Sequence, residues 1–222
     1  ITSYLDKIEP DFFGSLNPIL QTGISASNFT MFKNIKRLLP GETLILDLKT
    51  AKISTKKYLK LSNLIDENEY NRLSSVNEKD LIQEYSSVLS KTIKNHGISD
   101  VPIAVAASLG LDSTIIMESL FSNSKEKINC ISYISHEDQK IFENKKIKKY
   151  FSNVNHFHFT EYNKNFLENL VYSTYYCEGV GREDNMILSE VSKIAKLKNI
   201  KVLLTGDGAD ELFGAIDYQQ KF

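Results

Sequence analysis

A loop at residues 106–114 carries residue types that bind phosphate, and it reads Ala-Ala-Ser-Leu-Gly-Leu-Asp-Ser-Thr. The hydroxyls of Ser108, Ser113 and Thr114, together with the free amides at the start of the next helix, form a site for an anion. Asp112 repels a bare anion, and a Mg²⁺ ion that joins its carboxylate to phosphate oxygens would accommodate it. The segment lacks the Gly-Lys-Ser/Thr ending of a Walker loop. A strand-to-helix turn capped by serine is the alternative.

A second loop, at residues 203–214, concentrates acidic side chains and reads Leu-Leu-Thr-Gly-Asp-Gly-Ala-Asp-Glu-Leu-Phe-Gly. The carboxylates of Asp207, Asp210 and Glu211 repel one another, and a cation or a reacting group would offset that repulsion. The alternative is a capped turn in which Asp210 and Glu211 begin a helix, where the helix dipole favours negative charge. We expect Asp207 and Asp210 to lie beside the first loop if the two preceding strands are neighbours.

The elements that must position these loops alternate between strand and helix from residue 77 onward. Asn77 is the expected N-cap of a helix, and the inward face predicted for that helix is Leu81, Tyr85, Val88, Leu89 and Thr92. Apolar segments predict strands at 101–107, 128–134, 154–159 and 200–205, and helices are predicted at 113–122, 138–151, 164–176 and 185–197. This alternation predicts an α/β fold with a parallel sheet and helices on both faces.

The first third of the chain is β-rich. Segments 43–48 and 53–58 predict an antiparallel hairpin, and the polar segment that follows has little periodicity. We therefore expect three parts, namely a β-rich tail at 1–60, a linker at 61–76 and the α/β part at 77–222.

Composition excludes several classes of partner. The chain has 27 Lys and Arg residues against 28 Asp and Glu residues, and this balance does not favour binding to nucleic acid or to an anionic membrane. No apolar run approaches the roughly 20 residues of a membrane span. Two cysteines indicate a reducing, cytoplasmic setting. The chain starts at Ile1 without an initiator Met or a signal-peptide pattern, so we expect it to be a piece of a longer protein.

The two loops together closely resemble the motifs of the asparagine synthetase family. The resemblance is carried by Ser-x-Gly-Leu-Asp-Ser at 108–113 and by Thr-Gly-Asp-Gly-x-Asp-Glu-Leu-Phe-Gly at 205–214. It extends to Thr30–Gly41 and the hairpin after it, which look like the end of a glutaminase-type domain. The resemblance implies that 77–222 is the N-terminal part of an ATP-pyrophosphatase synthetase domain with an adenine nucleotide alpha hydrolase-like fold.

The resemblance also implies a role for each matching position. Ser108, Gly110, Asp112 and Ser113 would form the pyrophosphate-binding loop. Ala107 and a residue near Tyr133 would lie against the nucleotide, and Thr205 and Gly206 would contact the adenylate. Asp207 would act in forming the acyl-adenylate, and Asp112 and Asp210 would hold Mg²⁺. Glu178 and Arg182 are further candidates for contact with substrate or nucleotide.

The chain departs from the family pattern at Leu109, where the family usually has glycine, and it carries Thr205 where serine is usual. A left-handed backbone at Leu109 would be strained, whereas a negative φ would mean that the loop has adapted. The N-terminal cysteine nucleophile of the glutaminase domain has no counterpart here.

The resemblance implies a ligase that uses ATP and Mg²⁺ to adenylate the side-chain carboxylate of aspartate and then transfers ammonia from glutamine to it. Its partners would be small molecules, and a homodimer is compatible with the family. Two alternatives stay open. One is an adenylating enzyme with another acceptor, such as a β-lactam synthetase or a lasso-peptide cyclase. The other, favoured by Leu109, is a relative that binds nucleotide without turnover.

Overall fold

The computed structural model describes residues 6–12, 28–121, 127–134, 144–152, 154–160, 166–176 and 183–213. The chain divides into two compact units, Ile1–Glu78 with Thr174–Gly181 and Lys79–Ser173 with Arg182–Phe222. We describe each unit by itself.

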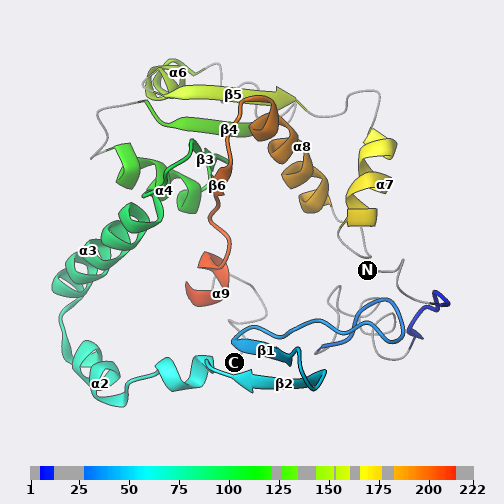
Figure 1. The fold of residues 1–222 in the computed structure, drawn as a ribbon. Helices are drawn as coiled ribbons and strands as arrows, with labels where there is room; N and C mark the ends of the chain where they lie inside the picture. Colours follow the sequence, from blue (N-terminus) through cyan, green and yellow to red (C-terminus); the bar gives the residue numbers. More distant parts are fainter. Residues whose placement is uncertain are drawn as a thin grey trace. The chain divides into compact units, whose positions relative to one another are not determined.

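The second unit contains a parallel sheet (Figure 1). Its strands are β3 (Ile103–Ala106), β4 (Asn129–Ile134), β5 (Asn155–Thr160) and β6 (Val202–Leu204). They lie in the order β5-β4-β3-β6, and every pair is parallel. The α/β fold predicted from the sequence is confirmed, and each of the four predicted strands is present with slightly different bounds.

The strand order reverses direction at β3. The chain moves outward from β3 to β4 and β5 and then returns to place β6 on the other side of β3. β3 and β6 are therefore the neighbouring strands between which the strand order changes direction. In open α/β sheets, ligands bind in the crevice at such a point. Both loops singled out in the sequence begin there.

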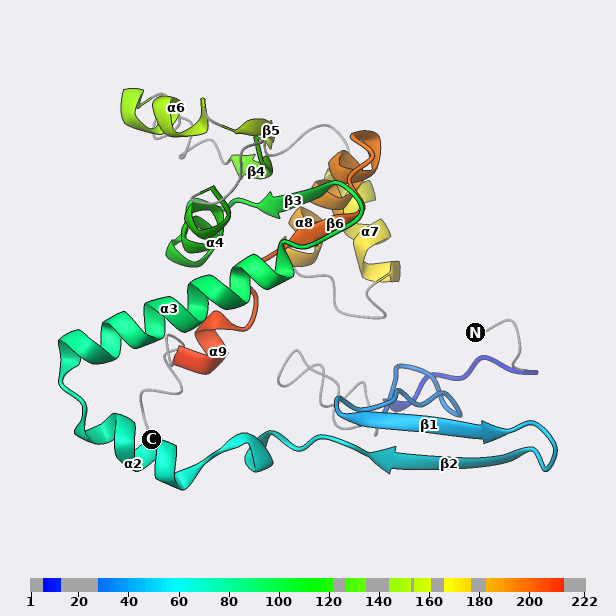
Figure 2. The ribbon, with the colours of Figure 1, turned by 60° about the vertical axis from the view of Figure 1, so that its left-hand side comes forward.

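Helices cover both faces of the sheet (Figure 2). These helices are α3 (Glu78–His96), α4 (Leu111–Phe121), α6 (Lys145–Phe151) and α8 (Glu183–Leu197). Helix α7 (Phe166–Tyr176) lies between β5 and α8 in the chain. On one face, Met117 of α4 and Phe151 of α6 join a buried cluster with Val105 of β3. On the other face, Val191 of α8 packs with Ala104 of β3. Adjacent residues of one strand thus face opposite layers, as the pleat requires.

The central strands are apolar on both sides because both sides are covered. Cys130 on β4 is fully buried, and burial raises the pKa of its thiol to about 12. This thiol stays protonated at neutral pH and acts as a small core residue.

Helix α3 packs differently from the sequence prediction. The buried residue of α3 is Ile93, whereas Leu81, Tyr85 and Val88 of the predicted inward face are exposed. Figure 2 shows the reason, because α3 extends beyond the sheet and only its C-terminal part lies next to it. The predicted helix at 138–151 is described from Lys145 to Phe151, and residues 138–143 lie outside the described residues.

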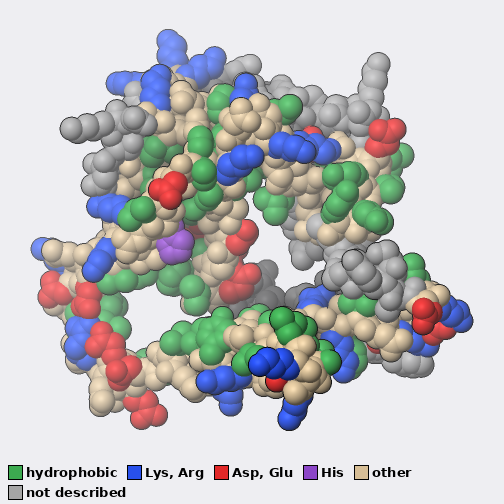
Figure 3. Space-filling view, in the orientation of Figure 1, with side chains coloured by type: hydrophobic (Ala, Val, Ile, Leu, Met, Phe, Trp, Pro, Cys, Tyr) green, Lys and Arg blue, Asp and Glu red, His purple; other side chains and the backbone are tan. Residues whose placement is uncertain are grey.

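The first unit contains the expected hairpin of β1 (Glu42–Asp47) and β2 (Lys52–Lys57), which are antiparallel, with Leu46 opposite Ile53. Gly41 precedes β1 with φ +76°, and a Cβ there would lie 2.3 Å from the carbonyl oxygen of Leu59. This position requires glycine. Side chains of β1 such as Leu44 are about half exposed in the described residues, and Figure 3 shows apolar side chains over this hairpin.

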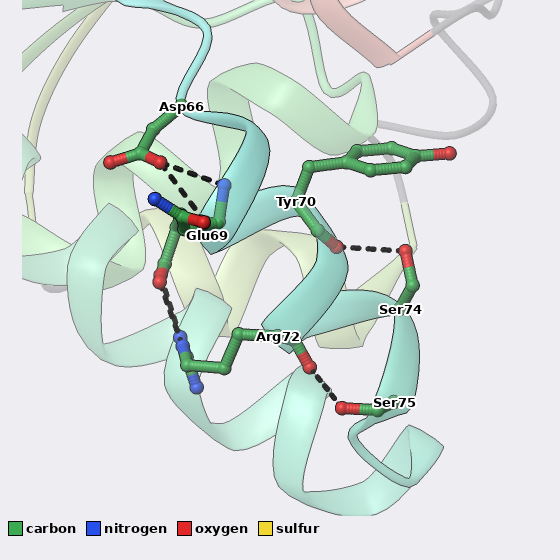
Figure 4. A network of polar contacts seen from close by, with 7 residues as sticks. Asp66, Glu69, Tyr70, Arg72, Ser74 and Ser75 are labelled. Atoms are coloured by element: carbon green, nitrogen blue, oxygen red, sulfur yellow. Dashed lines mark hydrogen bonds and ion pairs between the residues drawn. The ribbon is translucent and has the colours of Figure 1, made fainter.

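The segment predicted as a linker, 61–76, contains a 3₁₀ helix at Leu61–Leu64 and helix α2 (Glu67–Ser75), neither with a buried residue. Local polar contacts stabilise α2 (Figure 4). The carboxylate of Asp66 accepts hydrogen bonds from the N–H groups of Asn68 and Glu69, which caps the helix. The Arg72 guanidinium donates to both carboxylate oxygens of Glu69, at 2.8 and 2.7 Å. A polar segment can therefore be helical without contributing to a core.

We expect Ile131→Ala to lower the free energy of unfolding by about 2–5 kcal/mol, because it leaves a cavity between β4 and α8. Ile131 is 1% exposed and lies in the cluster with Val191. Ile98→Ala is the matched control, since Ile98 is 80% exposed, and we expect a change of about 0.5 kcal/mol or less. Urea denaturation measures both variants. Equal losses would contradict the assigned core.

Candidate functional site

Two loops at the carboxyl ends of neighbouring strands form the candidate site. The first connects β3 to α4 at residues 107–110, and the second connects β6 to α9 (Ala209–Phe213) at residues 205–208. Val105 of β3 pairs with Leu204 of β6, so the loops leave the sheet side by side. Parallel pairing therefore places two loops from distant parts of the chain next to each other.

Hydrogen bonds inside the first loop organise its hydroxyl groups. The Oγ of Ser108 accepts from the Gly110 N–H at 3.3 Å and lies 3.1 Å from the Oγ of Ser113. Ser113 Oγ donates to the Gly110 carbonyl at 3.1 Å, and Thr114 Oγ1 donates to the same oxygen at 2.8 Å. Because Ser113 uses its proton on Gly110, Ser108 donates to Ser113. The loop is thus tied to the first turn of α4.

The helix after this loop begins at Leu111, two residues earlier than predicted, so Asp112 lies in the first turn of α4. A carboxylate at a helix N-terminus is favoured by the helix dipole. Ser113 is only 4% exposed, so its hydroxyl contacts Gly110 of the loop from the buried side. Ala107 is also buried, and its N–H donates to the carbonyl of Ile131.

The second loop holds Asp207 through a neighbouring hydroxyl. Thr205 Oγ1 donates a 2.7 Å hydrogen bond to Oδ2 of Asp207. Gly208 has φ +94°, a backbone conformation that L side chains rarely adopt. Asp210 then falls in the first turn of α9 and is exposed. The loop therefore presents two carboxylates from a turn that glycine permits.

The two loops touch at Gly206. A Cβ built on Gly206 would lie 2.8 Å from the Cβ of Asp112 and 3.6 Å from the backbone nitrogen of Ser113. A separation of 2.8 Å is shorter than real Cβ contacts, so glycine is what allows this approach. The main chain of one loop thus packs against the acidic residue of the other.

The loops open into a pocket of about 900 Å³. The carboxylate residues Asp112, Asp207 and Asp210 all line it, together with Thr205 and Gly206. The expected proximity of Asp207 and Asp210 to the first loop is therefore present. Of the other predicted residues, Ala107, Ser108 and Gly110 belong to the first loop and Ser113 to the first turn of α4, and they do not line this pocket. Tyr133 lies on β4 with its hydroxyl oxygen buried.

The rest of the pocket wall is mostly apolar and comes from α3, α4 and α9. Tyr85 and Leu89 of α3 contribute to it, and Tyr85 meets Phe213 of α9 edge to face with ring centroids 5.4 Å apart. The sequence pattern assigned Tyr85 and Leu89 to the core face of a helix, and their regular spacing was the available signal. Glu178 and Arg182 lie outside the described residues.

The acidic residues suit a cation that arrives with phosphate. Among the described residues, no group of three or more His, Cys, Asp or Glu side chains forms a metal site by itself. Mg²⁺ is commonly held by one or two carboxylates, with phosphate oxygens and water completing its shell. Asp112 and Asp210, which both line the pocket, fit that pattern.

A parallel α/β sheet with a hydroxyl-rich loop and an acidic loop at its switch point defines a class of nucleotide-binding domains. The chain belongs to the asparagine synthase family, whose family model matches residues 84–221. The resemblance inferred from the two loop motifs is thereby confirmed.

A protein of Methanocaldococcus jannaschii named "Putative asparagine synthetase (glutamine-hydrolyzing) 2" is 29% identical over an alignment of 197 residues, and the match covers 86% of this chain. The chain spans 36% of the length of that relative. Within the described segments, no helix has both the length and the apolar character needed to cross a membrane.

We expect Gly206→Ala to destabilise the protein by about 1–3 kcal/mol, because the new methyl group forces Asp112 and the start of α4 to shift. Gly110→Ala is the control, since the nearest atom to its Cβ would be the Ser108 hydroxyl oxygen at 3.2 Å, which a side-chain rotation can move. Urea denaturation of both variants tests the contact. A loss for Gly206→Ala no larger than that for Gly110→Ala would show that the loops are not in register at this point.

Proposed function

We propose that this protein is an ATP-dependent amide-forming ligase that adenylates the side-chain carboxylate of aspartate, releases pyrophosphate and transfers ammonia from glutamine to give asparagine. The observation that carries the proposal is the contact of Gly206 with Asp112, which places Asp112 of the first motif in one pocket with the second motif. Family membership supports ligase chemistry with ATP. The acceptor and the ammonia source are part of the proposal.

The first loop is the proposed pyrophosphate site. Ser108 and Gly110 lie just before the N-terminus of α4, where free backbone amides and the helix dipole attract phosphate oxygens. Ser113 holds Gly110 from below through its hydroxyl. Fixed donors of this kind stabilise charge that develops on the phosphate without reorganising during the reaction. Ala107 and Tyr133 are proposed to border the nucleotide.

The second loop is the proposed reacting side of the pocket. Asp207 acts in formation of the acyl-adenylate, and the Thr205 hydroxyl orients its carboxylate through the 2.7 Å hydrogen bond. Thr205 and Gly206 are proposed to contact the adenylate from this loop, while the missing side chain of Gly206 leaves room for Asp112. Asp112 and Asp210 would hold Mg²⁺. When bound, that ion neutralises charge on the phosphate oxygens.

Residues 1–60, which contain the β1–β2 hairpin and Thr30–Gly41, are proposed to be the end of a glutaminase-type domain. The ammonia would come from that domain, the setting would be the cytoplasm, and other partners would be small molecules. A β-lactam synthetase or lasso-peptide cyclase acceptor is the competing assignment. The apolar wall from Tyr85 to Phe213 is the feature that an apolar acceptor would use.

We expect the full-length protein to exchange labelled pyrophosphate into ATP only when Mg²⁺ and a carboxylate acceptor are present. Aspartate is the expected acceptor, because the proposed reaction forms its acyl-adenylate. Exchange with glutamate and with apolar amino acids serves as the comparison. Exchange that prefers an apolar acid would favour the competing assignment, and no exchange despite measurable ATP binding would favour a relative without turnover.

Asp207→Asn and Asp210→Asn should have different effects. Asp207→Asn is expected to lower kcat for exchange at least tenfold with little change in ATP affinity, a loss of about 1.4 kcal/mol or more of transition-state stabilisation. Asp210→Asn is expected to raise the Mg²⁺ concentration required for half-maximal exchange. Glu211→Gln, next to Asp210 in the same helix, is the control for charge alone. Rates within about twofold of wild type for both Asp variants would contradict the assignment, because this is less than ~0.5 kcal/mol.

A further inference from the structure

Leu109 occupies the position where the phosphate loop reverses from β3 toward α4, and its φ is +64°. An L-residue with a branched side chain is disfavoured there, since its Cβ crowds the following carbonyl oxygen. Glycine has no such conflict. Leu109 has this left-handed conformation even so, and other contacts must therefore offset its cost.

The side chain of Leu109 supplies one such contact. It is partly buried and packs against the core cluster that contains Val105, Ala107 and Met117. The backbone on either side is held by hydrogen bonds, from the Gly110 N–H to Ser108 and from Ser113 and Thr114 to the Gly110 carbonyl. The apolar anchor therefore points into the core, while the polar atoms of Ser108 and Gly110 remain at the exposed side of the loop.

We propose that Leu109 is a positioning residue that holds the phosphate loop in its binding conformation before nucleotide arrives. This inference rests on the proposed function of the loop. Glycine would allow the same backbone conformation but also many others, so a loop with glycine must be ordered when ATP binds. The leucine side chain makes that ordering step unnecessary, because its packing against the core holds the turn between β3 and α4 in place.

Two variants remove the core contact of the Leu109 side chain while still permitting the left-handed backbone conformation. Leu109→Gly removes the anchor and permits φ > 0, and Leu109→Asn removes the anchor with a residue that tolerates the left-handed region. For both we expect the KM for ATP in pyrophosphate exchange to rise about two- to fivefold, with kcat within twofold and the KM for the acceptor unchanged. Asn199→Gly is the control, because Asn199 is also left-handed, at φ +56°, and follows α8.

Hydrogen exchange of the full-length protein gives a second readout. Without nucleotide, amides at 107–113 should exchange faster in Leu109→Gly than in wild type, and saturating ATP with Mg²⁺ should remove most of the difference. Unchanged exchange in that segment, or tighter ATP binding by Leu109→Gly, would overturn the role of Leu109 alone. Failure of the wild type to bind ATP would instead overturn the proposed function, and the role of Leu109 toward phosphate with it.

Discussion

The candidate site depends on how closely β3 and β6 bring their loops together. The absence of a side chain at Gly206 lets the second loop lie against Asp112 and the first turn of α4. Pairing of Val105 with Leu204 aligns the carboxyl ends of the two strands, so both loops begin at the same edge of the sheet. Every later feature, including the shared pocket of Asp112, Asp207 and Asp210, follows from that approach.

The site combines hydrogen-bonded loops with exposed carboxylates. Hydrogen bonds link Ser108 with Gly110 and Ser113, and Thr205 donates to Asp207, so contacts within each loop orient its polar groups. The carboxylates of Asp207 and Asp210 are exposed, which lowers the cost of their charge through contact with water. Exposed carboxylates of this kind suit a cation that arrives with phosphate. This is consistent with a family whose chemistry consumes ATP.

Leu109 shows how one position can combine a local cost with a tertiary gain. Its backbone has the φ that a glycine would supply, at a cost of about 1–2 kcal/mol for an L-residue. Burial of part of a leucine side chain contributes a similar amount in the opposite direction. The two effects nearly cancel in stability, but only leucine connects the loop to the core formed by Val105 and Met117.

The sequence by itself determined the alternation of strands and helices, the hairpin and the two motifs, because these are local patterns of polarity and residue type. It also allowed the proximity of Asp207 and Asp210 to the first loop to be expected, but only on the condition that two strands were neighbours. The tertiary structure decided that condition through strand order, and it decided the sign of φ at Leu109. It also showed that Tyr85 and Leu89 line the pocket. The sequence could not show this, because the apolar face of a helix looks the same whether it packs against a core or lines a cavity. Strand order and loop contacts depend on the packing of residues that are distant in sequence, and local patterns do not contain that information.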